Sequence, residues 1–241
     1  FRMRPELSAT ATVEEILSKK SVIELRELAR SFYVKGSSKM RKVELISEVK
    51  AALMIPERLE DLLYVLDSAA WQTFRKAAET SEPVQLNLTE SRWYQILHGL
   101  CYLHFITGNR SLACNVPPEI RTVYNSLVTD GLIQRKKHYD QLHLYAEAAA
   151  NLYGVISQDD FVALFNSQNE DITSKEELFD ALIRHIVVDA GYCFWDKYIV
   201  DIGFEDNGFA DVSDLLAQIG DKPRYIPEKK EFLKYADWRY F

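Results

Sequence analysis

Helix-start signals recur along this chain, and apolar residues at helical spacing follow them. Thr12 with Glu15, and Ser21 with Glu24, fit the capping box, in which a hydroxyl and a carboxylate three residues apart close the first turn of a helix. After Ser21, apolar residues recur at helical spacing as far as Phe32. Because the chain also has only 9 glycines in 241 residues, the sequence predicts a mainly helical fold.

A glycine-containing break separates two short helices predicted near the N-terminus. The first helix follows Ser21, and Gly36 in the run VKGSSK is free to adopt a positive φ after it. A second helix is predicted after Ser38, and Pro56 begins the next unit. The apolar face of this second helix is predicted to consist of Met40, Val43, Ile46, Val49 and Leu53.

The start of this second helix carries the most specific motif in the chain. Residues 39–42 read KMRK, and residues 44–46 read ELI, one turn after the glycine break. With these residues, the segment 19–53 resembles the N-terminal helical domain of the transcription terminator Rho, and is similar to SAP-type helix–extension–helix modules. The resemblance covers about a seventh of the chain and implies a small module that lies near nucleic acid. The ATPase of Rho has no counterpart here, because the sequence contains no G-x-x-x-x-G-K-[ST] phosphate loop.

Basic charge gathers at the N-terminal end of an otherwise acidic chain. The net charge is −7, yet residues 1–55 carry 11 Lys and Arg against 7 Asp and Glu, whereas residues 141–241 carry 9 against 19. Cationic side chains that contact phosphates release counterions from a polyanion. We predict a nucleic-acid-binding surface, directed at the backbone of DNA or RNA, made of Arg26, Arg30, Lys35, Ser38, Lys39, Arg41 and Lys42.

The sequence leaves alternatives open for the role of these basic residues. Four carboxylates offset the cations, which also fits a small helical module whose charged side chains are only solvated and bind no nucleic acid. These carboxylates are Glu24, Glu27, Glu44 and Glu48. Ser37 and Ser38 are expected to add neutral donors at a helix N-terminus. A second basic run, QRKKH at 134–138, follows a helix predicted to end at Gly131-Leu132. That run either extends the phosphate track or forms a solvated connector between domains.

The rest of the chain predicts helices followed by β-hairpins, the order found in winged-helix units. Helices are predicted over 57–79 and 90–100, before two strand-like runs, YLHFI and LACNV, around a Gly108-Asn109 turn. Towards the C-terminus, one helix is expected to end near Gly154. Two more are expected to start at Ser157 and near Thr173, before a hairpin with Asp196-Lys197 near its turn.

The third helix of this last unit carries too much negative charge to enter a DNA groove. In a winged helix that reads DNA, this helix would lie among phosphates. Here it bears more carboxylates than cations, so we interpret the unit as a module for packing or for binding another protein. The opposed charges are Glu176, Glu177, Asp180 and Asp189 against Lys175 and Arg184. Aromatic residues near the C-terminus are expected to dock a closing helix back onto the body.

The sequence predicts neither an enzyme nor a metal or cofactor site. His98, Cys101 and His104 are residue types that zinc accepts, but a helix would turn His104 away from His98, and no C-x-x-C pair anchors a site. The signatures G-x-S-x-G, H-E-x-x-H and G-x-G-x-x-G are all missing from the sequence. Three cysteines at wide spacing argue against a disulfide framework, and Cys193 is expected to be a small core residue.

The resulting prediction is a mainly α protein with short β-hairpin wings. It comprises a Rho-N/SAP-like helical module at 1–55, a helical and possible winged-helix-like unit at 56–140, and an acidic winged-helix-like unit with a docking helix at 141–241. The expected function is a non-enzymatic, cytoplasmic, nucleic-acid-associated protein whose acidic part is a scaffold or partner surface. The alternative is a protein–protein adaptor that binds no nucleic acid. The start at Phe1 rather than at methionine fits a piece of a longer protein, and no apolar run predicts a membrane span.

Overall fold

The computed structural model describes residues 8–107, 111–220 and 222–240, and by its internal contacts the chain divides into two compact units. The units are Phe1–Leu132 and Ile133–Phe241, and each is described by itself. Both are mainly helical with short β-hairpins, as the sequence predicts, and in each unit a third strand completes a small antiparallel sheet. The domain boundaries expected after residues 55 and 140 stay predictions. Within the described residues, no helix is both long and apolar enough to cross a membrane.

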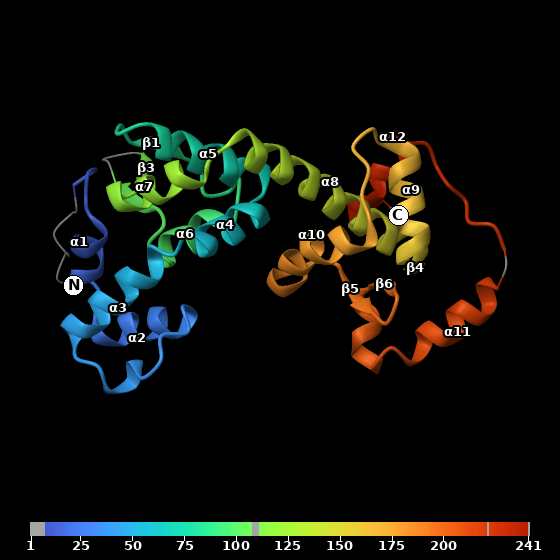
Figure 1. The fold of residues 1–241 in the computed structure, drawn as a ribbon, viewed down its shortest axis with the longest axis horizontal. Coiled ribbons are helices and arrows are strands. Elements are labelled where there is room, and N and C mark those ends of the chain that lie inside the picture. The colour runs from blue at the N-terminus through green and yellow to red at the C-terminus, as the bar shows by residue number, and fades with distance from the viewer. Residues whose placement is uncertain (1–7, 108–110, 221, 241) are drawn as a thin grey trace. The chain divides into compact units, whose positions relative to one another are not determined.

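The first unit begins with three helices, and two capping boxes place the first two of them. α1 (Val13–Ser18) is capped by Thr12 with Glu15, and α2 (Val22–Ser31) by Ser21 with Glu24, which confirms both predicted starts. α2 packs beside α3 (Lys42–Leu53), and the two helices lie next to one another in Figure 1. Gly36 has the predicted positive φ, of 74°. α4 (Pro56–Val65) begins at the proline that was expected to open the next unit.

The predicted start of α3 is wrong, and so is one residue of its predicted buried face. The helix begins at Lys42 rather than after Ser38, because the Arg41 backbone N–H donates to the Glu44 carboxylate at 2.7 Å and fixes the first turn there. Its buried face is predicted in part: Val49 and Leu53 are buried and Met40 and Ile46 pack against the core, whereas Val43 is 79% exposed. A strict three-residue spacing turns back by about 60° around a helix at each step, so Val43, two steps before Val49, leaves the core face. The residues that are buried are Leu45, Val49, Ala52 and Leu53.

The rest of the first unit includes three helices and a three-stranded sheet. The helices are α5 (Ser68–Glu79), α6 (Trp93–Gly99) and α7 (Pro118–Leu127). The strands are β1 (Val84–Leu86), β2 (His104–Thr107) and β3 (Leu112–Asn115), in the order β1-β3-β2. The hairpin of β2 and β3 is confirmed, whereas its predicted Gly108-Asn109 turn lies outside the described residues. β1 was not predicted, because a strand of three residues is too short to show a period of two.

The second unit contains three long helices and a second sheet. α8 (Asp130–Tyr153) crosses the boundary between the units and leads to α9 (Gln158–Gln168) and α10 (Lys175–Val188). The strands β4 (Val155–Ser157), β5 (Tyr192–Trp195) and β6 (Tyr198–Asp201) pair in the order β4-β6-β5. The predicted order of three helices and a hairpin is therefore present, with β4 as an addition. The remaining elements are η2 (Ile202–Asn207), α11 (Ala210–Ile219), α12 (Lys229–Phe232), η3 (Leu233–Ala236) and η4 (Trp238–Tyr240).

Three local predictions in this unit have different outcomes. The hairpin turn at Asp196-Lys197 is confirmed, because the two residues separate β5 from β6. The α9 cap is also as expected, since the Ser157 hydroxyl accepts from the Asp160 backbone N–H. α10 begins near Thr173, as predicted, but its cap is the next residue, because the Ser174 hydroxyl, rather than that of Thr173, accepts a backbone N–H, from Glu177. The Thr173 side chain is turned into the protein and donates to the Glu177 carboxylate.

The basic run at 134–138 lies in α8, the helix that crosses the boundary between the units, and does not form an open track. The helix predicted to end at Gly131-Leu132 is wrong, because α7 ends at Leu127 and Gly131 lies in the first turn of α8. Lys136 faces inward with its side chain only 2% exposed, and its ammonium group pairs with Asp140 at 2.5 Å. Arg135 and Lys137 point to solvent from the same helix. Helical periodicity thus divides the run between the core and the surface.

The C-terminal segment docks onto the second unit, as predicted. Phe232 of α12 is fully buried, and its ring lies 5.1 Å from that of Tyr145 on α8, measured between centroids. The Gln168 side chain donates to the Pro227 carbonyl at 2.8 Å, and the Asn151 side chain donates to the Tyr235 carbonyl at 2.8 Å. These side-chain contacts attach the segment to α8 and α9 in several places.

Two histidines stack inside the second unit. The rings of His143 on α8 and His185 on α10 are parallel, with centroids 3.8 Å apart, and His143 Nδ1 lies 2.9 Å from the Tyr192 hydroxyl. Burial lowers the pKa of His143 to about 4 and, with the nearby His143 ring adding to it, the pKa of His185 to about 3. Both rings are therefore neutral in the folded protein at neutral pH.

This histidine pair predicts acid sensitivity. The unfolded chain protonates its histidines near pH 6.5, so stability is fully present above that pH and falls as the pH drops towards about 4, by up to about 1.4 kcal/mol per histidine and pH unit. Asp140 and Glu147, whose pKa values burial raises, oppose this loss. We therefore expect urea unfolding at pH 7 and pH 5 to show a larger loss for the wild type than for His143→Gln/His185→Gln. Equal losses in the two proteins would contradict the prediction.

A close contact at Gly191 predicts a second effect in this unit. The Gly191 backbone N–H donates to Glu147 Oε1 at 2.9 Å, and a Cβ on residue 191 would lie 2.5 Å from Glu147 Oε2. Gly191→Ala must displace this half-buried carboxylate, so we expect a loss of about 1–3 kcal/mol in the free energy of unfolding. Gly99→Ala is the matched control, because a Cβ there meets nothing within 4 Å. Equal denaturation midpoints for the two variants would contradict the expected clash.

Candidate nucleic-acid interface

The predicted basic residues lie on α2, on the connector that follows it, and at the start of α3. Arg26 and Arg30 are one turn apart on α2. Arg30 is exposed, whereas Arg26 is half-buried and its Nε is enclosed without a hydrogen-bond partner among the described residues. Arg30 is therefore the better placed of the two to meet a phosphate.

The connector presents Lys35, Ser38 and Lys39 to solvent. Ser37 does not contribute, because its side chain is buried. Ser37–Lys39 form a 3₁₀ turn, η1, so the two serines do not lie at the N-terminus of α3 as predicted. The neutral donors expected there are reduced to the exposed Ser38 hydroxyl.

At the start of α3, the two basic residues differ in their contacts. Arg41 is the N-cap residue and is exposed. The Lys42 ammonium group donates to the Ser18 carbonyl at 2.8 Å, which ties the start of α3 to the end of α1. Farther along α3, Lys50 lies 3.1 Å from Glu14 and 3.6 Å from Glu119, so its charge is neutralised within the fold. The available cation at this end is therefore Arg41, with Lys42 partly engaged.

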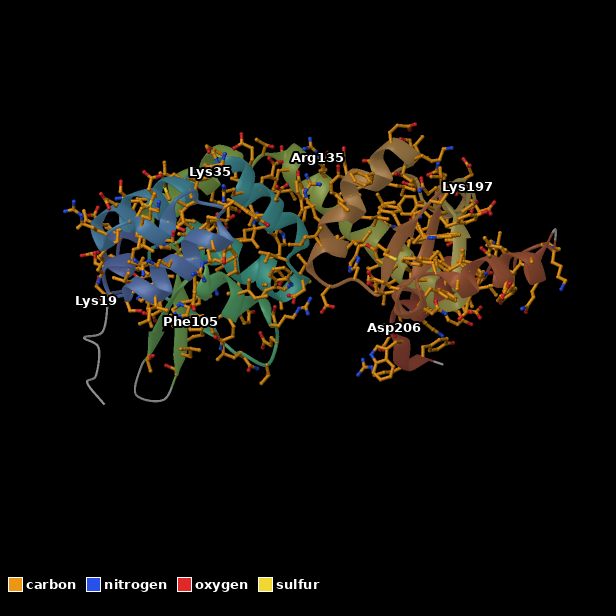
Figure 2. All side chains as sticks on the ribbon, turned by 90° about the horizontal axis from the view of Figure 1, so that it is seen from below. Lys19, Lys35, Phe105, Arg135, Lys197 and Asp206 are labelled. Carbon is orange, nitrogen blue, oxygen red and sulfur yellow. The ribbon has the colours of Figure 1, made fainter. Side chains whose placement is uncertain are left out.

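These contacts divide the predicted residues into two groups rather than one patch. The first group lies at the C-terminal end of α2, and the second lies at the start of α3. The Val34 backbone N–H donates to the Ala29 carbonyl, which holds Lys35 beside the C-terminal end of α2. Lys42 instead lies beside Ser18, before the start of α2. The ten residues of α2 span about 15 Å. Figure 2 likewise shows Lys35 and Lys19, which neighbours Ser18 in the chain, at separate places on the first unit.

Two further residues, which were not predicted, lie beside the C-terminal end of α2. The Arg58 guanidinium group of α4 donates to the Phe32 carbonyl at 2.8 Å and lies over the Phe32 ring. Tyr33, the next residue, is 88% exposed. The surface formed by Arg30, Tyr33, Lys35 and Arg58 is called the α2-end surface below.

Tyr33 has an unusual backbone conformation for its residue type. Its φ is 55°, in the left-handed region that favours glycine, which costs a residue with a side chain about 1–2 kcal/mol. A Gly or Asn at this place would have marked the end of the helix, whereas Tyr in the sequence gives no such signal. Nothing in the sequence therefore singles out Tyr33.

The histidine and cysteine cluster has the contacts of a protein core. Within residues 8–107, 111–220 and 222–240, no three His, Cys, Asp or Glu side chains are arranged to hold a metal ion. The His98 ring stacks on Phe105 with centroids 4.1 Å apart. Burial raises the pKa of Cys101 to about 11 and of Cys114 to about 12, so both thiols stay protonated at neutral pH. Burial also raises the pKa of the Cys193 thiol.

The comparisons with known proteins bear on one segment. Residues 17–57 match the family described as the Rho termination factor, N-terminal domain. The match covers about a sixth of the 241-residue chain and confirms the resemblance of the N-terminal module. No curated protein and no solved structure matches the sequence. The family assignment therefore applies to this module, and it indicates nucleic-acid binding in general terms.

Proposed function

We propose that this is a non-enzymatic, cytoplasmic protein that binds the phosphate backbone of nucleic acid through its N-terminal module. The contacts are made by the predicted residues, with the exposed ones carrying most of the affinity. One observation carries the proposal: Arg30, Lys35, Lys39 and Arg41 are exposed, and none has an ion-pair partner in the described part of the chain. Exposed cations without an ion-pair partner are available to replace the counterions of a polyanion.

The family match supports the same proposal, because it covers the whole segment from α2 to the start of α4. The cytoplasmic location is supported by Cys101, Cys114 and Cys193, which are all buried free thiols. The contacts are proposed to be with phosphates rather than base edges, since the exposed groups are mostly long, flexible cations. Low sequence specificity and strong salt dependence follow from that.

The second unit is proposed to be a winged-helix-like scaffold that does not touch nucleic acid. Its third helix, α10, exposes Glu176 and Asp180, which phosphates would repel. A specific observation favours a protein partner for this unit. Phe179 is 57% exposed and Val187 is 78% exposed on the same helix. Exposed apolar side chains mark a protein–protein contact where they form a contiguous patch, so an adaptor role through this helix is the second candidate function.

The test is a binding titration with the full chain and four fluorescent probes: single-stranded and double-stranded DNA and RNA. Fluorescence anisotropy at about 50 mM and about 200 mM salt reports affinity and its salt dependence. We expect binding at the lower salt that weakens clearly at the higher salt. If no probe binds at the lower salt, the nucleic-acid function is wrong, and the adaptor function takes its place.

A further inference from the structure

The backbone just after α2, at Tyr33, adopts a helix-terminating motif that usually contains glycine. The Val34 backbone N–H donates to the Ala29 carbonyl at 2.8 Å, and the Tyr33 backbone N–H donates to the Arg30 carbonyl at 2.9 Å. This pair of hydrogen bonds defines the Schellman motif, whose left-handed residue is most often glycine because it lacks a Cβ. The chain has a large aromatic residue at that position.

No intramolecular contact explains this choice. The Tyr33 side chain is almost fully in solvent, and across the described residues it makes no hydrogen bond and no ring contact. The other described residues of positive φ, glycine aside, are accounted for locally. Cys101 is buried, Phe209 stacks near Trp195, and Asp196 is of a type that tolerates this conformation in a turn. Strain retained at an exposed aromatic residue points to a role outside the fold.

The surroundings of Tyr33 are cationic. Arg30 lies one turn earlier on α2, and Lys35 follows two residues later. Arg58 is held next to Tyr33 by its hydrogen bond to the adjacent Phe32 carbonyl. An exposed aromatic ring among cations is the combination by which proteins bind single strands, with bases on the ring and phosphates on the cations.

We propose that Tyr33 stacks on an unpaired base of single-stranded nucleic acid while Arg30, Lys35 and Arg58 contact the flanking phosphates. This inference rests on the proposed function and specifies its ligand. A base in a duplex already stacks on its neighbours, so the ring gains a partner only where the strand is unpaired. Because every base has a π-face, the contact adds affinity with little sequence preference.

The test compares Tyr33→Gly with Tyr33→Phe in the full chain, using labelled single-stranded and double-stranded oligonucleotides. Tyr33→Gly removes the ring and introduces the residue that the left-handed position favours, so the melting temperature should rise or stay unchanged. Its affinity for single strands should fall about 5- to 150-fold, the equivalent of one lost stacking contact. Tyr33→Phe keeps the ring and should bind like the wild type.

The outcomes separate this inference from the proposed function. Loss of single-strand affinity in a Tyr33→Gly variant that is at least as stable as the wild type supports stacking, because unfolding cannot explain it. Undiminished binding by Tyr33→Gly overturns the stacking contact and leaves the phosphate-binding function intact. A loss in Tyr33→Phe as large as that in Tyr33→Gly also overturns stacking, since it assigns the effect to the hydroxyl. Failure of the wild type to bind any single strand overturns both.

Discussion

Phe232→Ala is expected to lower the free energy of unfolding of the second unit by about 3–5 kcal/mol. The ring is fully buried and packs on Tyr145 and Tyr153, with centroids 5.1 Å and 6.3 Å away. Removing it leaves a cavity between α12 and α8, which the surrounding aromatic rings cannot fill without leaving their own contacts. Among the changes considered for this protein, it has the largest expected effect on stability.

Urea denaturation followed by tryptophan fluorescence measures this loss, because the second unit contains Trp195, which is kept in both variants below. The matched control is Trp238→Ala in the same C-terminal segment, where the side chain is exposed and the change should stay within about 0.5 kcal/mol. A loss below about 1 kcal/mol in Phe232→Ala would mean that the C-terminal segment is not docked as the structure has it.

Arg30→Glu/Lys35→Glu is expected to weaken binding to single-stranded nucleic acid about tenfold or more at low salt. Both cations belong to the α2-end surface, both are exposed, and the substitutions replace two attractive charges by two repulsive ones. Neither side chain is part of the hydrophobic core, so the fold should be retained. Anisotropy titration gives the affinity, and circular dichroism confirms the helical content.

The control for this pair is Lys197→Glu/Lys230→Glu, which changes the net charge equally. Both lysines are exposed in the acidic second unit. A general effect of net charge would weaken binding in both double variants, whereas a site at the α2-end surface would weaken it only in the first. Equal affinity for the two variants would remove the N-terminal module from the binding site.

Local polar signals were sufficient to predict several elements of the fold. The capping boxes at Thr12 and Ser21 were correct, because each is completed by a carboxylate three residues away and needs no tertiary contact. The hairpin turn at Asp196-Lys197 was also predicted from local sequence, because its two residues lie between two strand-like runs. The short strands β1 and β4 were not, since each consists of three residues and exists through pairing with β3 or β6.

The candidate site was predictable in its residue types and less so in its geometry. The basic residues of the module were found by charge alone, but charge does not tell that Lys42 bonds to Ser18, or that Lys50 pairs with Glu14. Arg58 reaches α2 from another helix, and Tyr33 is conspicuous only by its backbone angle. Such features depend on tertiary packing and on backbone conformation, which residue types alone do not reveal.

The salt dependence of single-strand binding, measured for the wild type and for Arg30→Glu/Lys35→Glu, tests the nucleic-acid function most directly. The slope of the logarithm of the association constant against that of the salt concentration counts the phosphates neutralised, at about 0.7 for each contact with a single strand. We predict a steep slope for the wild type, and a slope shallower by about 1.4 for the variant, which loses two contacts. Absence of wild-type binding at low salt, or equal slopes for the two proteins, would contradict a phosphate-binding role for this module.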